Sequence, residues 1–378
     1  MWLRRSGAAT ALLLVVILVA GTFYFSEVIE DELFRASPVV PEADVEVLAV
    51  TDSFVTLART ADSRRPGIQG LEWGDGYVRA GRILGETETS VTRDLPEGPG
   101  GLSKGMVLAI DPFAFETDPD DVGLDFDDVT VESEFGRFPA WRIDGDDDTW
   151  AIVVHGAGVT RREALRILPT LEQAGLTALV VTYRNDTGAP AADDGRHRLG
   201  AQEWEDLEAA VAYALDEGAQ DVVLVGYAMG GSIAATFMRE SDLAGRVQGL
   251  VLDAPLLDAG AVVDRRAADR GIPGFISGWA KALAAVRFGI DWSELDHLAA
   301  ADTFTVPILL FHGDADDTAP KGVSDAFAAA RPDIVTYVQV EGAGHAVSWN
   351  SDPRRYERAV AAFVTEVAVG PSDLGPRG

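Results

Sequence analysis

Residues 221–240 read DVVLVGYAMGGSIAATFMRE, and this stretch decides the fold. Its first part, DVVLVG, is a near-continuous apolar run, which is typical of a strand buried on both faces of a parallel sheet. Its last part, SIAATFMRE, has the character of a helix. The short segment between them carries glycine at positions 226 and 230 and alanine at position 228. We therefore predict a strand, a tight turn and a helix.

The same alternation continues on both sides of this unit. Strand-like runs at WAIVVHG, ALVVTY, GLVLDAP and PILLFHG alternate with helix-like runs such as RREALRILPTLEQAG and PRRYERAVAAFVTEV. Alternating strands and helices predict a doubly wound α/β fold with a mostly parallel sheet over residues 128–368. A mostly helical insertion lies at about residues 258–300. We expect it to form a cap over a pocket, because such sheets bind ligands outside the carboxyl ends of their strands.

The segments that flank this domain are harder to interpret. Residues 27–127 lack strong periodicity, and LEWGDGYVRAGRIL within them resembles two short strands around a Gly-Asp-Gly turn. We predict a small β-rich, membrane-proximal region there. Residues 369–378 are expected to form a flexible C-terminal tail.

The N-terminus predicts a membrane anchor at residues 1–26. Two arginines, Arg4 and Arg5, precede the apolar stretch Gly7–Phe25, and four acidic residues follow it between positions 27 and 32. About 20 apolar residues span the hydrocarbon core as a helix. The charge asymmetry predicts a single-pass protein with a cytoplasmic N-terminus and an extracytoplasmic catalytic domain. A cleaved signal peptide is the alternative.

Composition excludes several classes of function. The chain has 378 residues, a formal net charge of −30 and 47% hydrophobic residues, which is typical of a globular protein. Its acidity disfavours binding to nucleic acid. Because the chain contains no cysteine, disulfides, thiolate metal sites and a catalytic cysteine are excluded.

An acidic segment, DPDDVGLDFDD at residues 118–128, resembles a calcium loop at first sight. Val122 occupies the third ligand position, and no glutamate closes the loop. We interpret this segment and the DGDDD run at residues 144–148 as solvated loops, and we predict no metal site.

Three of the five histidines lie directly after strand-like runs. These are His155 in VVHGAG, His312 in LLFHGDADD and His345 in VEGAGHAVSW. Active sites of doubly wound folds gather at the carboxyl ends of their strands. The three histidines are therefore candidates for a common site, although any single histidine is more often a packed or surface residue.

Four motifs together resemble the α/β-hydrolase superfamily. They are VVHGAG (153–158), VGYAMGG (225–231), ILLFHGDADDTAP (308–320) and EGAGHAVSW (341–349), and each follows a strand-like run. Their order matches the family order of nucleophile, acid and histidine. The likeness is greatest to bacterial membrane-anchored members near the dienelactone-hydrolase and prolyl-oligopeptidase branches. The resemblance covers residues 128–368.

The resemblance implies a catalytic triad that lacks its nucleophile. His345 would be the general base and then the general acid, and Asp316 would fix its tautomer. Asp316 stands three residues after the glycine of HGDADD, which favours it over Asp314 and Asp317. The nucleophile position of the G-x-S-x-G turn is occupied by Ala228.

Other roles are implied for residues around this turn. The backbone N–H groups of Met229 and Ala157 would form the oxyanion hole, and His155 would shape the second of these loops. Tyr227 and Tyr183 are candidates for substrate contact.

The function implied by the resemblance is hydrolysis of an ester, thioester or amide in a small-molecule or peptide substrate, without a cofactor. Ser232 lies a turn down the helix, too far from the elbow to replace the serine. Four interpretations of Ala228 remain: a Ser-to-Ala change in a true hydrolase, a pseudohydrolase that binds a ligand or partner, a His–Asp pair that works without a covalent step, and a likeness of fold alone.

Overall fold

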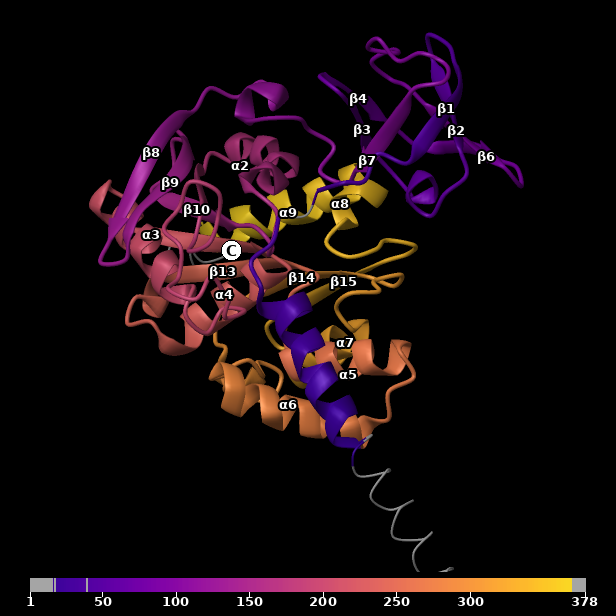
Figure 1. Ribbon diagram of the computed structural model, residues 1–378. Coiled ribbons are helices and arrows are strands. Elements are labelled where there is room, and N and C mark those ends of the chain that lie inside the picture. The colour runs from indigo at the N-terminus through magenta and orange to yellow at the C-terminus, as the bar shows by residue number, and fades with distance from the viewer. Residues whose placement is uncertain (1–15, 17, 39, 369–378) are drawn as a thin grey trace, which may run out of the picture.

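The computed structural model describes residues 16, 18–38 and 40–368, and it contains two sheets (Figure 1). The larger sheet has eight strands in the order β15-β14-β13-β12-β10-β11-β9-β8. The strands β10 to β15 pair in parallel, whereas β9 pairs antiparallel with β11 and with β8. The predicted doubly wound α/β architecture is thus confirmed, with an antiparallel hairpin at one edge. These strands are β8 (Asp127–Ser133), β9 (Gly136–Ile143), β10 (Thr149–Val154), β11 (Thr177–Val181), β12 (Asp221–Tyr227), β13 (Val247–Asp253), β14 (Ile308–Gly313) and β15 (Val335–Val340).

Helices cover both faces of this sheet. One face packs against α3 (Trp204–Asp216), α4 (Met229–Glu240) and α7 (Lys321–Ala330), and the other against α2 (Leu168–Gln173) and α9 (Pro353–Ala368). Strands β10, β11 and β12 are buried almost along their whole length, which explains why their sequences are apolar without alternation. Two short helices, η4 (Arg161–Arg166) and α8 (Ser348–Ser351), lie close to the candidate site.

The insertion after β13 is helical, as expected. It contains α5 (Ala259–Asp269) and α6 (Gly274–Phe288). It begins and ends close together, because Asp258 forms an isolated bridge with Asp296 and the His297 N–H donates to the Leu257 carbonyl at 2.8 Å. Its buried residues join the core on the α4 face of the sheet. We call residues 258–300 the cap insertion.

The second sheet has seven strands, all within residues 45–111. Its order is β4-β3-β7-β1-β2-β6-β5, and its core consists of short aliphatic side chains. The predicted hairpin around Gly74 is the pair β3 and β4. We call residues 45–111 the β-module. Its strands are β1 (Val45–Val50), β2 (Phe54–Ala58), β3 (Gln69–Trp73), β4 (Gly76–Ala80), β5 (Ile83–Glu86), β6 (Ser90–Asp94) and β7 (Val107–Asp111).

The segment before the β-module differs from the β-rich region expected from residue 27. Residues 18–29 form a helix that continues into a π-helical turn, η1 (Glu30–Phe34), and Phe25, Ile29, Leu33 and Phe34 are buried in the core of the α/β domain. The reason is their helical spacing, which presents one apolar stripe to that core. The predicted anchor, Gly7–Phe25, starts outside the described residues, and the predicted tail lies wholly outside them. No helix within the described ranges is long and apolar enough to cross a membrane.

Candidate active site

The turn between β12 and α4 holds Ala228 in a strained backbone conformation. Its φ is 47° and its ψ is −111°, a region that costs a residue other than glycine about 1–3 kcal/mol. Both flanking glycines are required by close packing. A Cβ on Gly226 would lie 2.7 Å from the carbonyl oxygen of Gly230, and one on Gly230 would lie 2.1 Å from the carbonyl oxygen of Val154. This turn is a nucleophile elbow in its geometry, with a methyl group where a nucleophile stands.

Two alanines packed against Ala228 also have a positive φ. Ala254 follows β13 with a φ of 49°, and Ala346 follows His345 with a φ of 50°. The three buried alanines form one small cluster, separate from the main cores. Strained residues concentrate at functional sites, because only a constrained surrounding structure keeps them in place. The cluster therefore marks the site at which the three loops meet.

His345 and Asp316 form the predicted pair. The Nδ1 atom of His345 lies 2.8 Å from Oδ2 of Asp316, and the N–H groups of Thr318 and Ala319 donate to Oδ1 at 2.8 Å each. The Nε2 atom of His312 lies 3.2 Å from the same oxygen, Oδ2 of Asp316. The histidine keeps 23% of its side chain exposed, whereas the carboxylate is buried. Because Nδ1 is engaged, Nε2 is the nitrogen available for proton transfer.

The pKa values of this pair move in opposite directions. Burial raises the pKa of Asp316, but hydrogen bonds from His312 and His345 more than offset this and hold it well below its usual range. Burial lowers the pKa of His345, but the hydrogen bond and the charge of Asp316 raise it by more, so the net shift is upward. The aspartate thus stays ionised and stabilises the imidazolium that proton transfer creates.

The loop after β10 brings the second predicted oxyanion donor to the elbow. A Cβ on Gly156 would lie 3.2 Å from the Cβ of Ala228, so the two backbones are in close approach. The first N–H groups of a helix have no partner within it, and no other described group accepts from the N–H of Met229 or Ala157. Both donors are therefore available to a ligand oxygen.

Three side chains fix this loop. Glu163 accepts from the Gly156 N–H at 2.8 Å, and the Tyr183 hydroxyl donates to the Gly156 carbonyl at 2.7 Å. The ring of His155 stacks on Tyr183, with Nδ1 2.8 Å from the Gly156 carbonyl and Nε2 2.9 Å from Asp186. Burial lowers the pKa of His155, but Asp186 more than offsets this and raises it. The expected shaping role of His155 agrees with these contacts.

The two tyrosines predicted to contact substrate are placed differently. Tyr227 is fully buried, and its ring packs under the guanidinium of Arg166 at 5.0 Å. Tyr183 is also buried and is committed to the loop after β10. Both predictions are wrong, because these side chains are buried in the two cores and are not exposed to a substrate. Ser232 is likewise committed, since its hydroxyl donates to the Leu199 carbonyl at 2.6 Å.

Sequence reasoning missed a buried network that joins the β-module to the site. The Nδ2 group of Asn350 donates to the carbonyls of Ile68 and Pro112, and its Oδ1 accepts from Arg166 at 3.0 Å. Arg166 donates in turn to the carbonyl of Ala346 at 2.8 Å and to Glu163 at 3.1 Å. Asn350 and Arg166 are buried. No motif or spacing in the sequence signals either residue.

Asp253, at the end of β13 and beside the elbow, is a buried carboxyl group that is only partly hydrogen-bonded. Its carbonyl accepts from the Ala228 N–H at 3.0 Å, its Oδ1 accepts from Ser348 at 2.7 Å, and its Oδ2 has no partner among the described residues. Burial raises its pKa to about 6.

Asp253→Asn is expected to stabilise the folded chain at neutral pH. The folded state holds the Asp253 proton up to about pH 6, whereas the unfolded chain releases it near 3.8, so stability falls with rising pH between these values. The amide resembles the neutral acid and does not titrate, so the variant does not lose this stability. Its free energy of unfolding should exceed that of the chain with Asp253 by about 3 kcal/mol above pH 6, and the difference should vanish near pH 4. Urea unfolding at several pH values measures it. A gain that is independent of pH would contradict the explanation.

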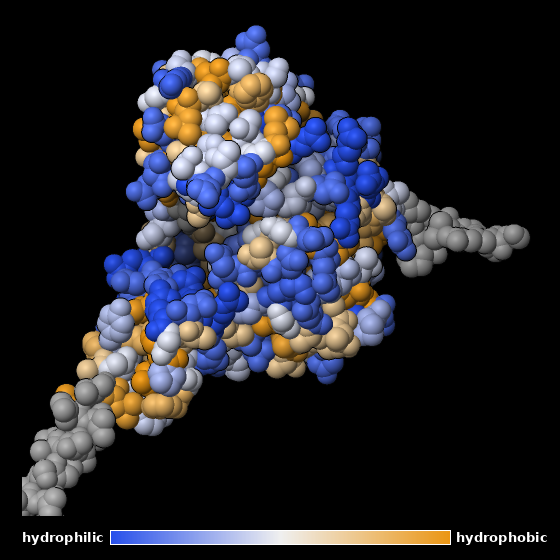
Figure 2. Space-filling view, turned by 90° about the vertical axis from the view of Figure 1, so that its right-hand side faces the viewer, coloured by the Kyte–Doolittle hydropathy of each residue, from blue (hydrophilic) through white to orange (hydrophobic). Residues whose placement is uncertain are grey.

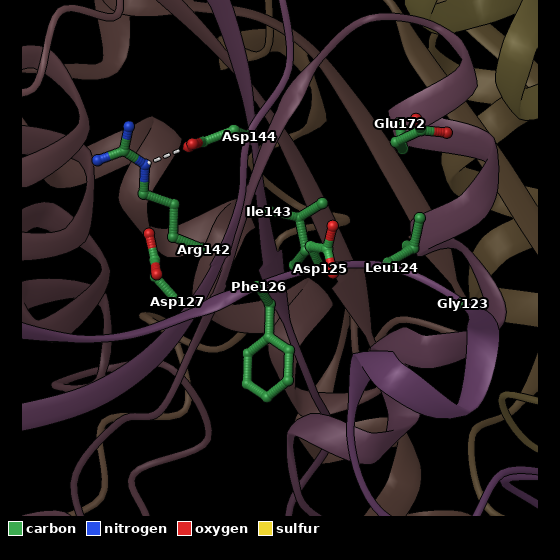
Figure 3. Close-up of a pocket in the computed structure, with 9 residues that line it drawn as sticks. All are labelled: Gly123, Leu124, Asp125, Phe126, Asp127, Arg142, Ile143, Asp144 and Glu172. Atoms are coloured by element: carbon green, nitrogen blue, oxygen red, sulfur yellow. Dashed lines mark hydrogen bonds and ion pairs between the residues drawn. The ribbon is translucent and has the colours of Figure 1, made fainter.

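Two pockets open elsewhere on the molecule. One, of about 400 Å³, lies between the start of β8, the end of β9 and α2 (Figure 3), and its lining includes Asp125, Asp127, Asp144 and Glu172 with Arg142. In Figure 3 the Arg142 guanidinium turns toward Asp144, with which it is paired at 2.8 Å. The other, of about 580 Å³, is lined by residues of the loop after β11 and the start of α3. Neither pocket is lined by the elbow, by His345 or Asp316, or by the cap insertion.

Comparison with known proteins accounts for the larger domain. A family model described as "Alpha/beta hydrolase family" matches residues 151–359, more than half of the chain. The chain belongs to the alpha/beta hydrolase family. A second model, described as "Domain of unknown function (DUF8805)", matches residues 46–110, within the β-module. No curated protein matches the chain.

Solved structures agree with the hydrolase fold. The esterase Pf2001 of Pyrococcus furiosus matches in three crystal forms, with 19% identity in each. The first covers 67% of this chain and 96% of the esterase at a TM-score of 0.54, and the second covers 66% and 94% at 0.53. An esterase of Pyrobaculum calidifontis is 17% identical, over 65% of this chain and 86% of that one, at a TM-score of 0.48. At these identities the likeness to Pf2001 concerns the fold.

Proposed function

We propose that this site is built for acyl transfer of the serine-hydrolase type, and that the chain with Ala228 binds an acyl substrate without forming an acyl-enzyme. One observation carries the proposal. The strained elbow, the ionised Asp316 behind His345 and two free backbone donors all remain, while the atom that would attack is missing. The esterase neighbours support an ester as the substrate class; thioesters and amides share the same acyl chemistry.

The chemistry that these groups support runs in two steps. With a hydroxyl at position 228, His345 Nε2 would take its proton as the oxygen attacks the acyl carbon, and the carbonyl oxygen would become an oxyanion between Met229 and Ala157. His345 would then return the proton to the leaving alcohol. Water would repeat both steps to release the acid. With Ala228 the donors still polarise the carbonyl, but no protein atom attacks it, so only a slow direct attack by water remains.

The pH profile of an Ala228→Ser variant tests these roles. Ester hydrolysis requires neutral His345, and because Asp316 raises the pKa of His345, the acid limb of kcat/KM is expected above the ordinary histidine value of about 6.5. Activity therefore falls as pH drops through that raised pKa. Asp316→Asn in the same background is expected to lower the limb and to reduce kcat. An acid limb that does not respond to Asp316→Asn would contradict the assignment.

A binding protein on a hydrolase scaffold is the second candidate function. The observation in its favour is the packing of Ala228 with Ala254 and Ala346, which fills the elbow with methyl groups. In that case the retained pocket would hold a ligand or protein partner. Ala228→Ser would then fold normally and still show no acylation.

Membrane anchoring forms part of the proposal. It is supported by the apolar sequence Gly7–Phe25 between two arginines and four acidic residues. In this arrangement the N-terminus is cytoplasmic and the hydrolase domain lies outside the cytoplasm.

A further inference from the structure

Helix α6 of the cap insertion exposes a row of large apolar side chains. Phe275, Trp279 and Val286 are 59%, 52% and 86% exposed. Their spacings of four and seven residues place them on one face of the helix. Phe275 and Trp279 contact each other edge to face, with ring centroids 6.0 Å apart. The opposite face, through Ser277, packs into the protein. An exposed row of this kind marks an interaction surface.

The N-terminal helix runs beside α6 and adds to this row. Arg287 of α6 donates to Ser26 at 2.6 Å, pairs with Glu27 and covers the ring of Phe23 at 4.3 Å. At the other side of the cap insertion, Glu32 pairs with Arg266 of α5 at 2.6 Å and also with Arg270. The helix is therefore fixed to the cap insertion by charged contacts on both of its cap helices.

The outward side of the N-terminal helix is apolar as well. Val16, Val19, Phe23 and Tyr24 are all exposed, and Figure 2 shows apolar residues gathered at the base of the molecule, around the start of the described chain. Figure 1 shows the N-terminal helix beside α6, on the side of the molecule away from the β-module. We call the surface formed by Phe23, Tyr24, Phe275, Trp279 and Val286 the cap face; Val16 and Val19 precede it in the apolar sequence Gly7–Phe25.

We propose that the cap face rests in the interface of a lipid bilayer. This inference depends on the membrane anchoring proposed above. The chain reaches the cap face directly from the apolar sequence Gly7–Phe25, which as a helix would be about 29 Å long, close to the hydrocarbon thickness of about 30 Å.

No linker separates that sequence from the folded domain, because Phe25 is already buried in the α/β core. The domain is therefore held against the membrane in one orientation. Phe23, Tyr24 and Trp279 then lie at the level of the headgroups, where aromatic residues accumulate in membrane proteins. Because the chain has a net charge of −30, anionic lipids do not attract it, and the cap face binds the membrane through its apolar side chains. A zwitterionic lipid is therefore sufficient for this binding.

The absence of cysteine from the sequence allows a direct test. Phe275→Cys, Trp279→Cys and Val286→Cys, each in the full chain, are labelled with an environment-sensitive fluorophore and reconstituted into phosphatidylcholine vesicles. Matched controls are Phe54→Cys and Leu84→Cys, which replace exposed apolar residues of the β-module. Nitroxide lipids labelled near the headgroup are expected to quench the cap-face probes about twofold or more and to leave the control probes unchanged.

The outcomes separate the inference from the anchoring. Vesicle flotation of the unlabelled chain reports anchoring alone, and a chain that does not float removes the anchor and the cap-face proposal together. A chain that floats with unquenched cap-face probes keeps its anchor and overturns the proposal. If lipid nitroxides do not quench the cap-face probes, and the probes instead become buried in detergent as the protein concentration rises, the cap face binds a second copy of the chain. That result also overturns the proposal.

Discussion

Replacing Ala228 by serine is expected to produce a chain that is labelled by a fluorophosphonate and hydrolyses short acyl esters. Its rate of hydrolysis should exceed that of the chain with Ala228 by about 10⁴-fold or more. Loss of the nucleophile from an intact triad of this kind costs up to about 10⁶ in kcat, and the reverse change recovers that factor to the extent that the geometry is preserved. The measurement combines gel-based labelling with steady-state hydrolysis of a series of acyl esters.

The reason for expecting recovery lies in the backbone. The elbow conformation of residue 228 is already in place. Gly226 and Gly230 are packed so tightly that a Cβ atom added at either position would clash. Serine adds a single oxygen to the side chain of Ala228. His345 is already paired with Asp316, which orients its ring and leaves Nε2 free to act as the base.

The alanine cluster supplies matched controls. Ala254→Ser and Ala346→Ser place the same hydroxyl on neighbouring buried alanines with the same sign of φ, and neither is expected to label. Ala228→Ser with His345→Ala should fold and remain unlabelled. Labelling at either control position, or activity that survives loss of His345, would contradict the triad. A folded Ala228→Ser chain without any reaction would favour the binding protein.

The sequence predicts the domain and the dyad well, because both depend on local pattern. Buried strands are apolar in sequence, and chemistry follows at their carboxyl ends. His345 and Asp316 could be chosen in this way, and the structure brings them to 2.8 Å. The strained turn at Ala228 follows from the two glycines that surround it.

The two tyrosines show where motif proximity misleads. Tyr227 continues the alternation of Val223 and Val225, and all three lie in the same core. Tyr183 likewise follows Leu179 and Val181 into the core on the other face of the sheet. Successive strand side chains point to opposite faces, so this periodicity would have placed both rings correctly. A residue that lies next to a motif in the sequence does not necessarily direct its side chain toward the site.

The network through Arg166 and Asn350 had no such signal. The two residues are 184 positions apart, and each resembles an ordinary polar residue of a short helix. Only the fold shows that these two side chains link the β-module to the loop of His345 and, through Glu163, to the loop after β10 that carries Ala157, which we call the oxyanion loop. A contact between domains depends on tertiary packing, which no local period encodes.

Asn350→Ala is expected to impair catalysis even though Asn350 touches no substrate. In the Ala228→Ser background we expect kcat to fall about 10- to 100-fold with little change in KM, and the free energy of unfolding to fall by about 3 kcal/mol. The change removes the donor for the carbonyls of Ile68 and Pro112 and an acceptor for the buried Arg166. Arg166 then holds the Ala346 carbonyl and Glu163 less firmly, and these flank the base and the oxyanion loop.

The β-module is built to keep this link in register. Arg93, buried in its core, donates to the Gly67 carbonyl at 2.9 Å and so fixes the segment that meets Asn350. Gly67 has a φ of +73°, and a Cβ there would lie 1.8 Å from the Asn350 carbonyl oxygen. The Ile68 N–H donates to the same oxygen at 2.9 Å. Because the contact is this close, a displacement of the module would be felt at Asn350.

Gln69→Ala separates positioning from simple loss of stability. Gln69 is buried in the same segment and donates to the Pro66 carbonyl at 2.8 Å, but it has no bond to Asn350 or Arg166. It is expected to lower the free energy of unfolding by about 1–3 kcal/mol and to leave kcat unchanged. If Asn350→Ala and Gln69→Ala lose stability alike and both retain kcat, the network only fastens the β-module. A selective loss of kcat in Asn350→Ala gives that module a part in holding the catalytic loops.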